Sequence, residues 1–195
     1  MMKIDKQLQK ECILLIKQIA SKVGYKKIQN TIYKTENGNI VFVDFVVVDS
    51  EYLIYRINIK KESYDNIFWR IMRMEENINE SYSLRITGAF AAPAALIADG
   101  KVELSENVDM IAKNFFKKVD GEITTFLEKN DVTQYIFSNN VKIDVNILRC
   151  LSYIESGSLL EAKKLAETQI ISGDRGRFKN EGKGFFELVL LYHSR

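Results

Sequence analysis

The chain has 195 residues, of which 46% are hydrophobic and 28% charged, and its formal net charge is +2. This composition is typical of a globular protein and excludes an intrinsically disordered chain. The 28 basic side chains are nearly balanced by 26 acidic ones, so the net charge does not favour a nucleic-acid partner.

Metal and membrane sites find little support. One histidine and two distant cysteines, Cys12 and Cys150, exclude a zinc site of the usual type. We expect two buried thiols, with a single disulfide as the alternative, and neither metal nor cofactor. The apolar run 13–16 is too short to span a membrane, so we expect a cytoplasmic protein. Abundant Lys, Ile and Asn suggest a bacterial source.

The first part of the chain changes its hydrophobic period from helical to alternating. Apolar residues three and four apart predict a helix over 3–23. Asn37-Gly38 is a strong hairpin signal, and the run 40–48 is apolar enough for a central strand. The predicted strands are 28–34, 40–48 and 52–60, a meander that follows chain order.

A second helix is predicted over 63–77 and a fourth strand over 82–90. Residues 91–104 fit either a small hairpin at Asp99-Gly100 or a helical turn. The rest of the chain is predicted to be helical, with a capping box at 158–161.

The expected fold is α+β, with an antiparallel sheet of about four strands, the first two helices on one face, and an all-helical C-terminal third. We expect a single domain over 1–195, formed by an α/β portion (1–104) and a helical portion (105–195) packed on it.

A polar sheet face is the one constellation that the register predicts. A two-residue turn at 37–38 pairs Tyr33 with Phe42 and Thr31 with Asp44, and a three-residue turn at 49–51 pairs Asp44 with Arg56. Asn58 also joins this face, and the fourth strand adds Ser83, Arg85 and Thr87 to it. A ligand or a partner protein could bind there; a solvated face with one cross-strand ion pair is the alternative.

Trp69 falls on the polar side of the second helix, beside Asp65 and Arg73. It either packs under the C-terminal helices or is an exposed anchor for a partner, with Arg73 as its charged neighbour. The segment 173–184, with four glycines and four basic residues, could hold a phosphate, but its spacing matches neither the P-loop nor the dinucleotide-binding fingerprint, and a mobile loop is the alternative.

The order of a helix, Gly24-Tyr25-Lys26-Lys27, Asn30-Thr31-Ile32-Tyr33 and a buried strand resembles the start of a family of small bacterial intracellular domains of unknown function. Some members lie near toxin–immunity genes. The resemblance covers the first third of the chain, carries no catalytic residues, and favours a binding protein.

The residues therefore predict a non-catalytic module of the bacterial cytoplasm that binds another protein, of an immunity-like or regulatory kind, without nucleic acid or membrane. No nucleophile–base pair, metal set or cofactor motif is found. The alternative is a small hydrolase or transferase that uses Asp44, Arg56 and Arg85.

Overall fold

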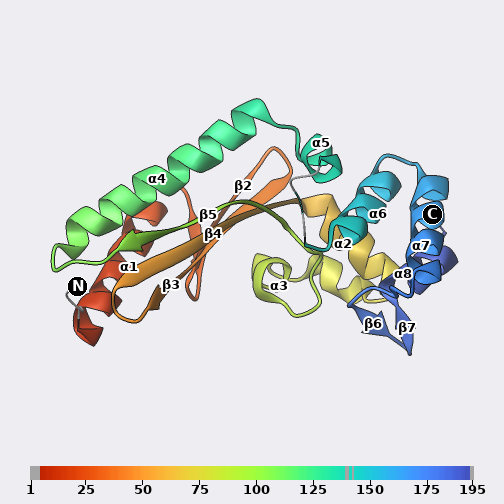
Figure 1. Ribbon diagram of the computed structural model, residues 1–195, viewed down its shortest axis with the longest axis horizontal. Helices are drawn as coiled ribbons and strands as arrows, with labels where there is room; N and C mark the ends of the chain where they lie inside the picture. The colour runs from red at the N-terminus through yellow and green to blue at the C-terminus, as the bar shows by residue number, and fades with distance from the viewer. Residues whose placement is uncertain (1–4, 139–140, 142, 194–195) are drawn as a thin grey trace. The chain divides into compact units, whose positions relative to one another are not determined.

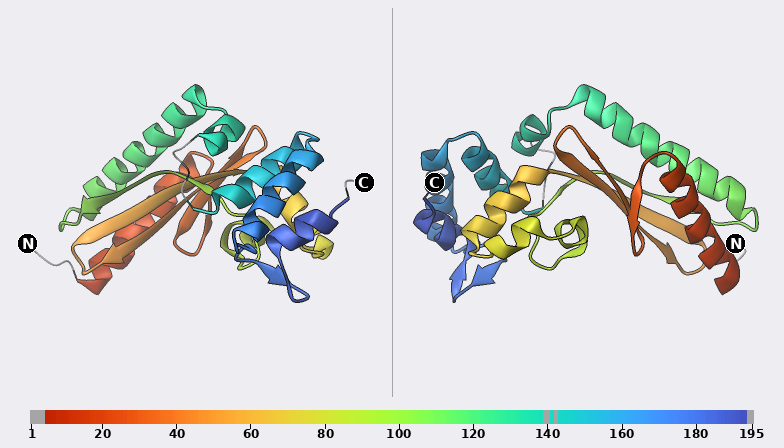
Figure 2. Two further views of the ribbon diagram at one scale, coloured as in Figure 1. Left: turned by 45° about the vertical axis from the view of Figure 1, so that its right-hand side comes forward. Right: turned by 180° about the vertical axis from the view of Figure 1, so that it is seen from behind.

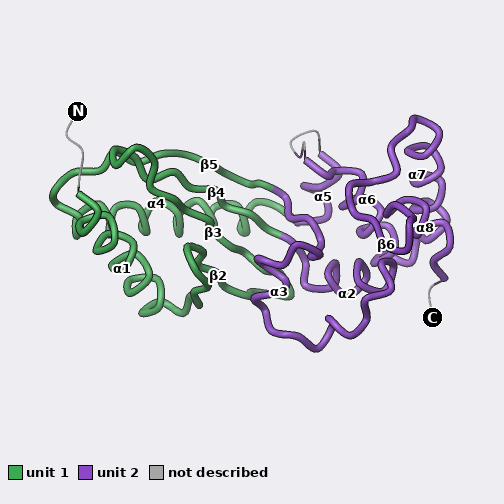
Figure 3. The backbone as a smooth tube through the Cα atoms, turned by 90° about the horizontal axis from the view of Figure 1, so that it is seen from below, with its two compact units in different colours: residues 1–59, 96–131 green, residues 60–95, 132–195 purple. Residues whose placement is uncertain are grey.

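The computed structural model describes residues 5–138, 141 and 143–193. The chain divides into two compact units, Met1–Ile59 with Leu96–Asp131 (unit 1) and Lys60–Ala95 with Val132–Arg195 (unit 2) (Figure 3). This division differs from the expected one at 104/105, because the long helix after residue 107 belongs with the sheet and the segment 60–95 belongs with the C-terminal helices. The single domain over 1–195 stays a prediction.

Unit 1 is built on a five-stranded antiparallel sheet whose strands follow chain order (Figure 1). The strands are β1 (Lys26–Ile28), β2 (Thr31–Glu36), β3 (Asn39–Val48), β4 (Tyr52–Lys61) and β5 (Ala95–Glu103). The α+β class, the order of the meander and the central place of β3 are confirmed. The sheet has five strands rather than about four.

The extra strand arises from a turn that periodicity did not reveal. The predicted strand 28–34 is interrupted at Gln29, whose φ of 48° reverses the chain into a short hairpin of β1 with β2. Residues 95–103 form the continuous strand β5, so neither reading of 91–104 is right. The alternation of hydrophobic and polar residues does not show where a turn lies when the turn depends on a glutamine in the left-handed backbone conformation.

The predicted register between β2 and β3 is confirmed. Thr31 pairs with Asp44, and Tyr33 pairs with Phe42. The turn has positive φ at both Asn37 (51°) and Gly38 (75°), as a two-residue hairpin of this type requires.

Two helices cover one face of the sheet, α1 (Lys6–Lys22) and α4 (Val108–Lys129) (Figure 2). Phe115 of α4 makes edge-to-face contacts with Phe45 of β3 and Tyr55 of β4, at centroid distances of 5.7 and 5.5 Å. Helix α1 packs along α4 through its buried stripe, which includes Cys12 and Ile16. The second helix of the chain belongs to unit 2, so its expected place on this face stays a prediction.

Unit 2 is mainly helical. Its elements are α2 (Glu62–Ile71), the 3-10 helix η1 (Glu75–Asn79), α3 (Tyr82–Thr87), α5 (Val132–Phe137), α6 (Val145–Glu155), α7 (Leu159–Ile171), β6 (Lys179–Asn180), β7 (Lys183–Gly184) and α8 (Phe185–Leu191). The predicted strand 82–90 is wrong, since its first six residues form α3. The predicted helix 63–77 ends at Ile71, because Arg73 has a φ of 56°.

The core of unit 2 forms between α2 and the C-terminal elements. Phe68 of α2 stacks on Phe185 and meets Phe178 edge to face, at centroid distances of 5.8 and 4.8 Å. The C-terminal third is not all-helical, because β6 and β7 form a hairpin. The capping box predicted at 158–161 is wrong, since Ser158 makes no side-chain cap bond to α7. Among the described residues, no helix is both long and apolar enough to cross a lipid bilayer.

Candidate functional site

The structure brings together only part of the predicted polar sheet face. Asp44 accepts hydrogen bonds from Thr31 (2.6 Å) and Asn58 (3.2 Å). Arg56 is exposed, and no ion pair joins it to Asp44 within the described residues. Tyr33 is buried, with 6% of its surface exposed. The carboxylate of Asp44 is thus satisfied by two neutral donors across neighbouring strands, and the predicted cross-strand ion pair is wrong.

Arg85 does not contribute to the sheet face. It lies on α3 with Ser83 and Thr87, and 5% of its side chain is exposed. A hydrolase or transferase site that combines Arg85 with Asp44 and Arg56 on one strand face therefore has no support in this arrangement.

Trp69 is fully buried, and its predicted packing under the C-terminal helices stays a prediction. Its indole nitrogen donates a hydrogen bond of 2.6 Å to the carbonyl of Phe90, and the guanidinium of Arg85 lies 4.8 Å from its ring. It is therefore not an exposed anchor. Arg73, the other predicted candidate in this part of the chain, lies just beyond the end of α2 and forms an ion pair of 2.5 Å with Glu181.

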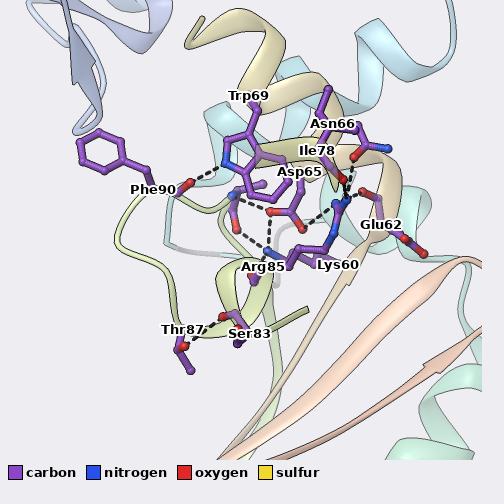
Figure 4. A network of polar contacts seen from close by, with 11 residues as sticks. Lys60, Glu62, Asp65, Asn66, Trp69, Ile78, Ser83, Arg85, Thr87 and Phe90 are labelled. Carbon is purple, nitrogen blue, oxygen red and sulfur yellow. Dashed lines mark hydrogen bonds and ion pairs between the residues drawn. The ribbon is translucent and has the colours of Figure 1, made fainter. Parts of the chain in front are cut away.

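Behind Trp69 lies a buried ionic cluster of Lys60, Asp65 and Arg85, which sequence reasoning missed (Figure 4). The ammonium of Lys60 donates to Asp65 (2.8 Å) and to the carbonyls of Arg85 (2.6 Å) and Ala92 (3.0 Å), so each of its three protons has an acceptor. One oxygen of Asp65 also accepts from the amide of Ala92. The signal was present in the sequence: Asp65 lies one turn before Trp69, so a buried Trp69 implies a buried carboxylate that needs cations.

Arg85 completes the cluster. It donates to the backbone carbonyls of Ile78 (2.8 Å) and Glu62 (3.3 Å) and to the side-chain oxygen of Asn66 (3.0 Å). Its guanidinium is 3.9 Å from the second oxygen of Asp65, which has no hydrogen bond among the described residues.

Burial sets the protonation behaviour of this cluster. It lowers the pKa of Lys60 and raises the pKa of Asp65, and in each residue the charge of the partner opposes the effect. Such shifts are common at catalytic sites, but the polar groups here face protein atoms that tie β4, α2, α3 and residues 90–92 together. We interpret the cluster as a structural centre of unit 2.

Arginines and a backbone amide of the glycine-rich segment 173–184 interact with carboxylates of the same chain. The carboxylate of Glu187 accepts from the amide of Gly184 (2.7 Å) and the guanidinium of Arg175 (2.8 Å), and Arg177 pairs with Asp144 at 2.9 Å. Two of the four basic groups that could hold a phosphate, the guanidiniums of Arg175 and Arg177, are therefore paired with carboxylates of the protein. Within the described part of the chain, no group of three or more His, Cys, Asp or Glu residues could hold a metal ion.

Unit 1 has a groove with a volume of about 730 Å³. It runs along strand β5 and helix α4. Its lining residues are Ile97, Ala98, Asn114, Lys117, Lys118, Gly121, Glu122, Thr125, Phe126, Lys129 and Asn130. None of them belongs to the predicted site. The signal for it was Gly121, an isolated glycine inside the helical stripe 108–127, which is costly without a packing or functional reason.

Strand β5 lies at one end of the strand order, so one of its edges faces away from β4. The amide of Leu104, directly after β5, donates to the carbonyl of Glu51, directly before β4 (2.7 Å). Since the backbone groups of successive strand residues point to opposite edges, the amides of Gly100 and Val102 point toward β4, and those of Asp99 and Lys101 point to the open edge. These two side chains are exposed.

Tyr55 joins the sheet to the groove. A Cβ atom on Gly100 would lie 2.8 Å from the Tyr55 hydroxyl, so a larger residue at that position would displace the Tyr55 ring. The hydroxyl donates to Glu122 of α4 at 3.2 Å, and the ammonium of Lys118 lies 5.4 Å from the Tyr55 ring. Burial is the main cause that raises the pKa of Tyr55, so it is a neutral phenol that fastens α4 over the sheet.

No protein-family model, curated protein or solved structure matches this chain. The resemblance of its first third to a family of bacterial domains therefore stays an expectation.

Proposed function

We propose that this chain is a non-catalytic module that binds another protein, and that the partner adds a strand to the open edge of β5. The observation that carries the proposal is the nine-residue edge strand β5 beside the groove that α4 lines. A long edge strand offers a row of unpaired amides and carbonyls, which an extended peptide can satisfy.

The neighbouring groove supports this mode of binding. In strand addition, main-chain hydrogen bonds provide affinity, while pockets for alternate side chains provide specificity. Here the side chains of an added strand would meet Ile97, Ala98 and Phe126 on one side and polar residues of α4 on the other.

We further propose that the module acts in the bacterial cytoplasm in an immunity-like or regulatory role. This proposal rests on the composition of the chain, on its sequence resemblance, and on the absence of a catalytic constellation among its sequence motifs.

The test is affinity capture from the native cell, followed by mass spectrometry, with three baits. The wild type and Asp99→Ala should retain the same protein partner. Asp99→Pro should lose it, because proline removes an outward amide without removing a bond to β4. The melting temperature of Asp99→Pro should stay close to that of Asp99→Ala.

Val102→Pro is the matched control for the edge. Its amide points toward β4, so this proline should lower the melting temperature clearly, unlike Asp99→Pro. The proposed function fails if a metabolite co-purifies without any protein, or if every partner is retained equally by Asp99→Pro.

A further inference from the structure

We infer that the segment which adds to β5 is acidic: an extended stretch of another protein with Asp or Glu at alternate positions. This inference rests on the proposed strand addition and names the chemistry of its partner. It is carried by the charges that line the groove and by the space above α4.

Three lysines line the groove from α4, Lys117, Lys118 and Lys129, and all three are exposed. Glu122 is the carboxylate among the lining residues, and it already accepts the hydroxyl of Tyr55. Neither Lys117 nor Lys129 has an ion-pair partner within the described residues. The groove therefore presents excess positive charge to whatever lies in it.

Gly121 provides the space for a close approach. It lies within the 22-residue helix α4, is exposed, and a Cβ atom built on it would meet no atom within 4 Å. A glycine inside a helix costs about 0.5–1 kcal/mol relative to alanine. Packing within unit 1 does not explain this residue, whereas a chain that runs close over α4 would.

A second copy of this chain fits the groove less well. The exposed side chains of its own β5 are Asp99, Lys101 and Glu103, so their charges alternate in sign. Such a strand would bring two carboxylates and also one lysine, and that lysine would meet the three lysines of the groove unfavourably. A uniformly acidic strand instead complements every cation of the groove.

The experiment uses the full chain and three fluorescent ten-residue peptides of Thr and Val that differ only at alternate positions, which hold Glu, Gln or Lys. Fluorescence anisotropy measures each affinity. We expect the Glu peptide to bind about tenfold more tightly than the Gln peptide, because two or three exposed charge pairs together account for such a ratio. The difference should shrink at about 0.5 M salt, since exposed charges are screened.

Charge reversal tests the lysines directly. The double variant Lys117→Glu with Lys129→Glu should prefer the Lys peptide to the Glu peptide. Lys113→Glu is the matched control, because Lys113 lies on the same helix, is exposed, and is not among the groove residues. That variant should keep the wild-type preference for the Glu peptide.

The variant Gly121→Ala distinguishes an effect on binding in the groove from an effect on the stability of helix α4. This variant should raise the melting temperature through helix propensity and at the same time weaken binding of the Glu peptide severalfold. A variant that becomes both more stable and equally able to bind would contradict the close approach at Gly121.

The outcomes distinguish this inference from the proposed function. Equal binding of the Glu and Gln peptides, both lost in Asp99→Pro, would overturn the acidic partner and leave strand addition standing. Binding of none of the peptides would overturn the acidic partner as stated, and the capture experiment would still decide strand addition. A dimer in sedimentation that Asp99→Pro dissociates would show that a second copy occupies β5, and would overturn the inference.

Discussion

The ammonium of Lys60 and the carboxylate of Asp65 are 2.8 Å apart, and neither side chain has more than 1% of its surface exposed. Their contact links the first turn of α2 to the end of β4. The arrangement carries two cations, Lys60 and Arg85, for one carboxylate, so Asp65 is the only anion of the cluster formed by these three residues. Removing it would leave two buried charges uncompensated.

We therefore expect Asp65→Ala to lower the free energy of unfolding by about 3–5 kcal/mol, as measured by urea denaturation. Lys61→Ala is the matched control, because its ion pair with Glu155 is partly exposed, and it should cost about 1 kcal/mol or less. If Asp65→Ala and Lys60→Met are additive in the double variant, the two residues do not interact as described.

The hydrogen bond from Thr31 to Asp44 leads to a second prediction. Thr31→Val and Asp44→Ala should each destabilise the chain by about 1 kcal/mol, and the double variant should cost clearly less than their sum. Arg56→Ala should change the melting temperature little, because Arg56 is exposed. A coupling energy between Asp44 and Arg56 as large as that with Thr31 would contradict the observed partners.

Trp69 is the single tryptophan, so its fluorescence reports on one site. Because it is fully buried, its emission should be blue-shifted and protected from iodide. Trp69→Ala should cost about 3–5 kcal/mol, and Trp69→Phe less, since phenylalanine keeps part of the packing but loses the bond to Phe90. Red-shifted, readily quenched emission would restore the exposed anchor.

The two thiols are free and buried, and burial raises the pKa of Cys12 to about 11 and of Cys150 to about 12. Neither should react with a disulfide reagent in the native protein at pH 8, and both should react after unfolding in urea. Above pH 9 the unfolded thiols lose protons that the folded ones keep, so this contribution to stability is full below pH 9 and falls as the pH rises. Cys150→Ala should reduce the slope of melting temperature against pH above pH 9.

Local patterns were enough for much of unit 1. The helix before Gly24, the Asn37-Gly38 hairpin and the register that pairs Thr31 with Asp44 depend on residues close in sequence, and all agree with the structure. The partner of Asp44 was not predicted correctly. Its carboxylate accepts hydrogen bonds from Thr31 and Asn58, and a prediction that pairs a carboxylate with the nearest cation does not consider neutral donors.

The sequence by itself determined the α+β class, the meander and the long helices, because hydrophobic period and turn chemistry act over a few residues. The tertiary structure decided which polar residues are buried. Residues 82–87 alternate like a strand, yet form a helix that directs Arg85 to distant carbonyls. The tertiary structure also places α4 beside β5, and the groove lies between them. Both results depend on contacts between segments far apart in the chain, and no local pattern encodes the free energy of those contacts.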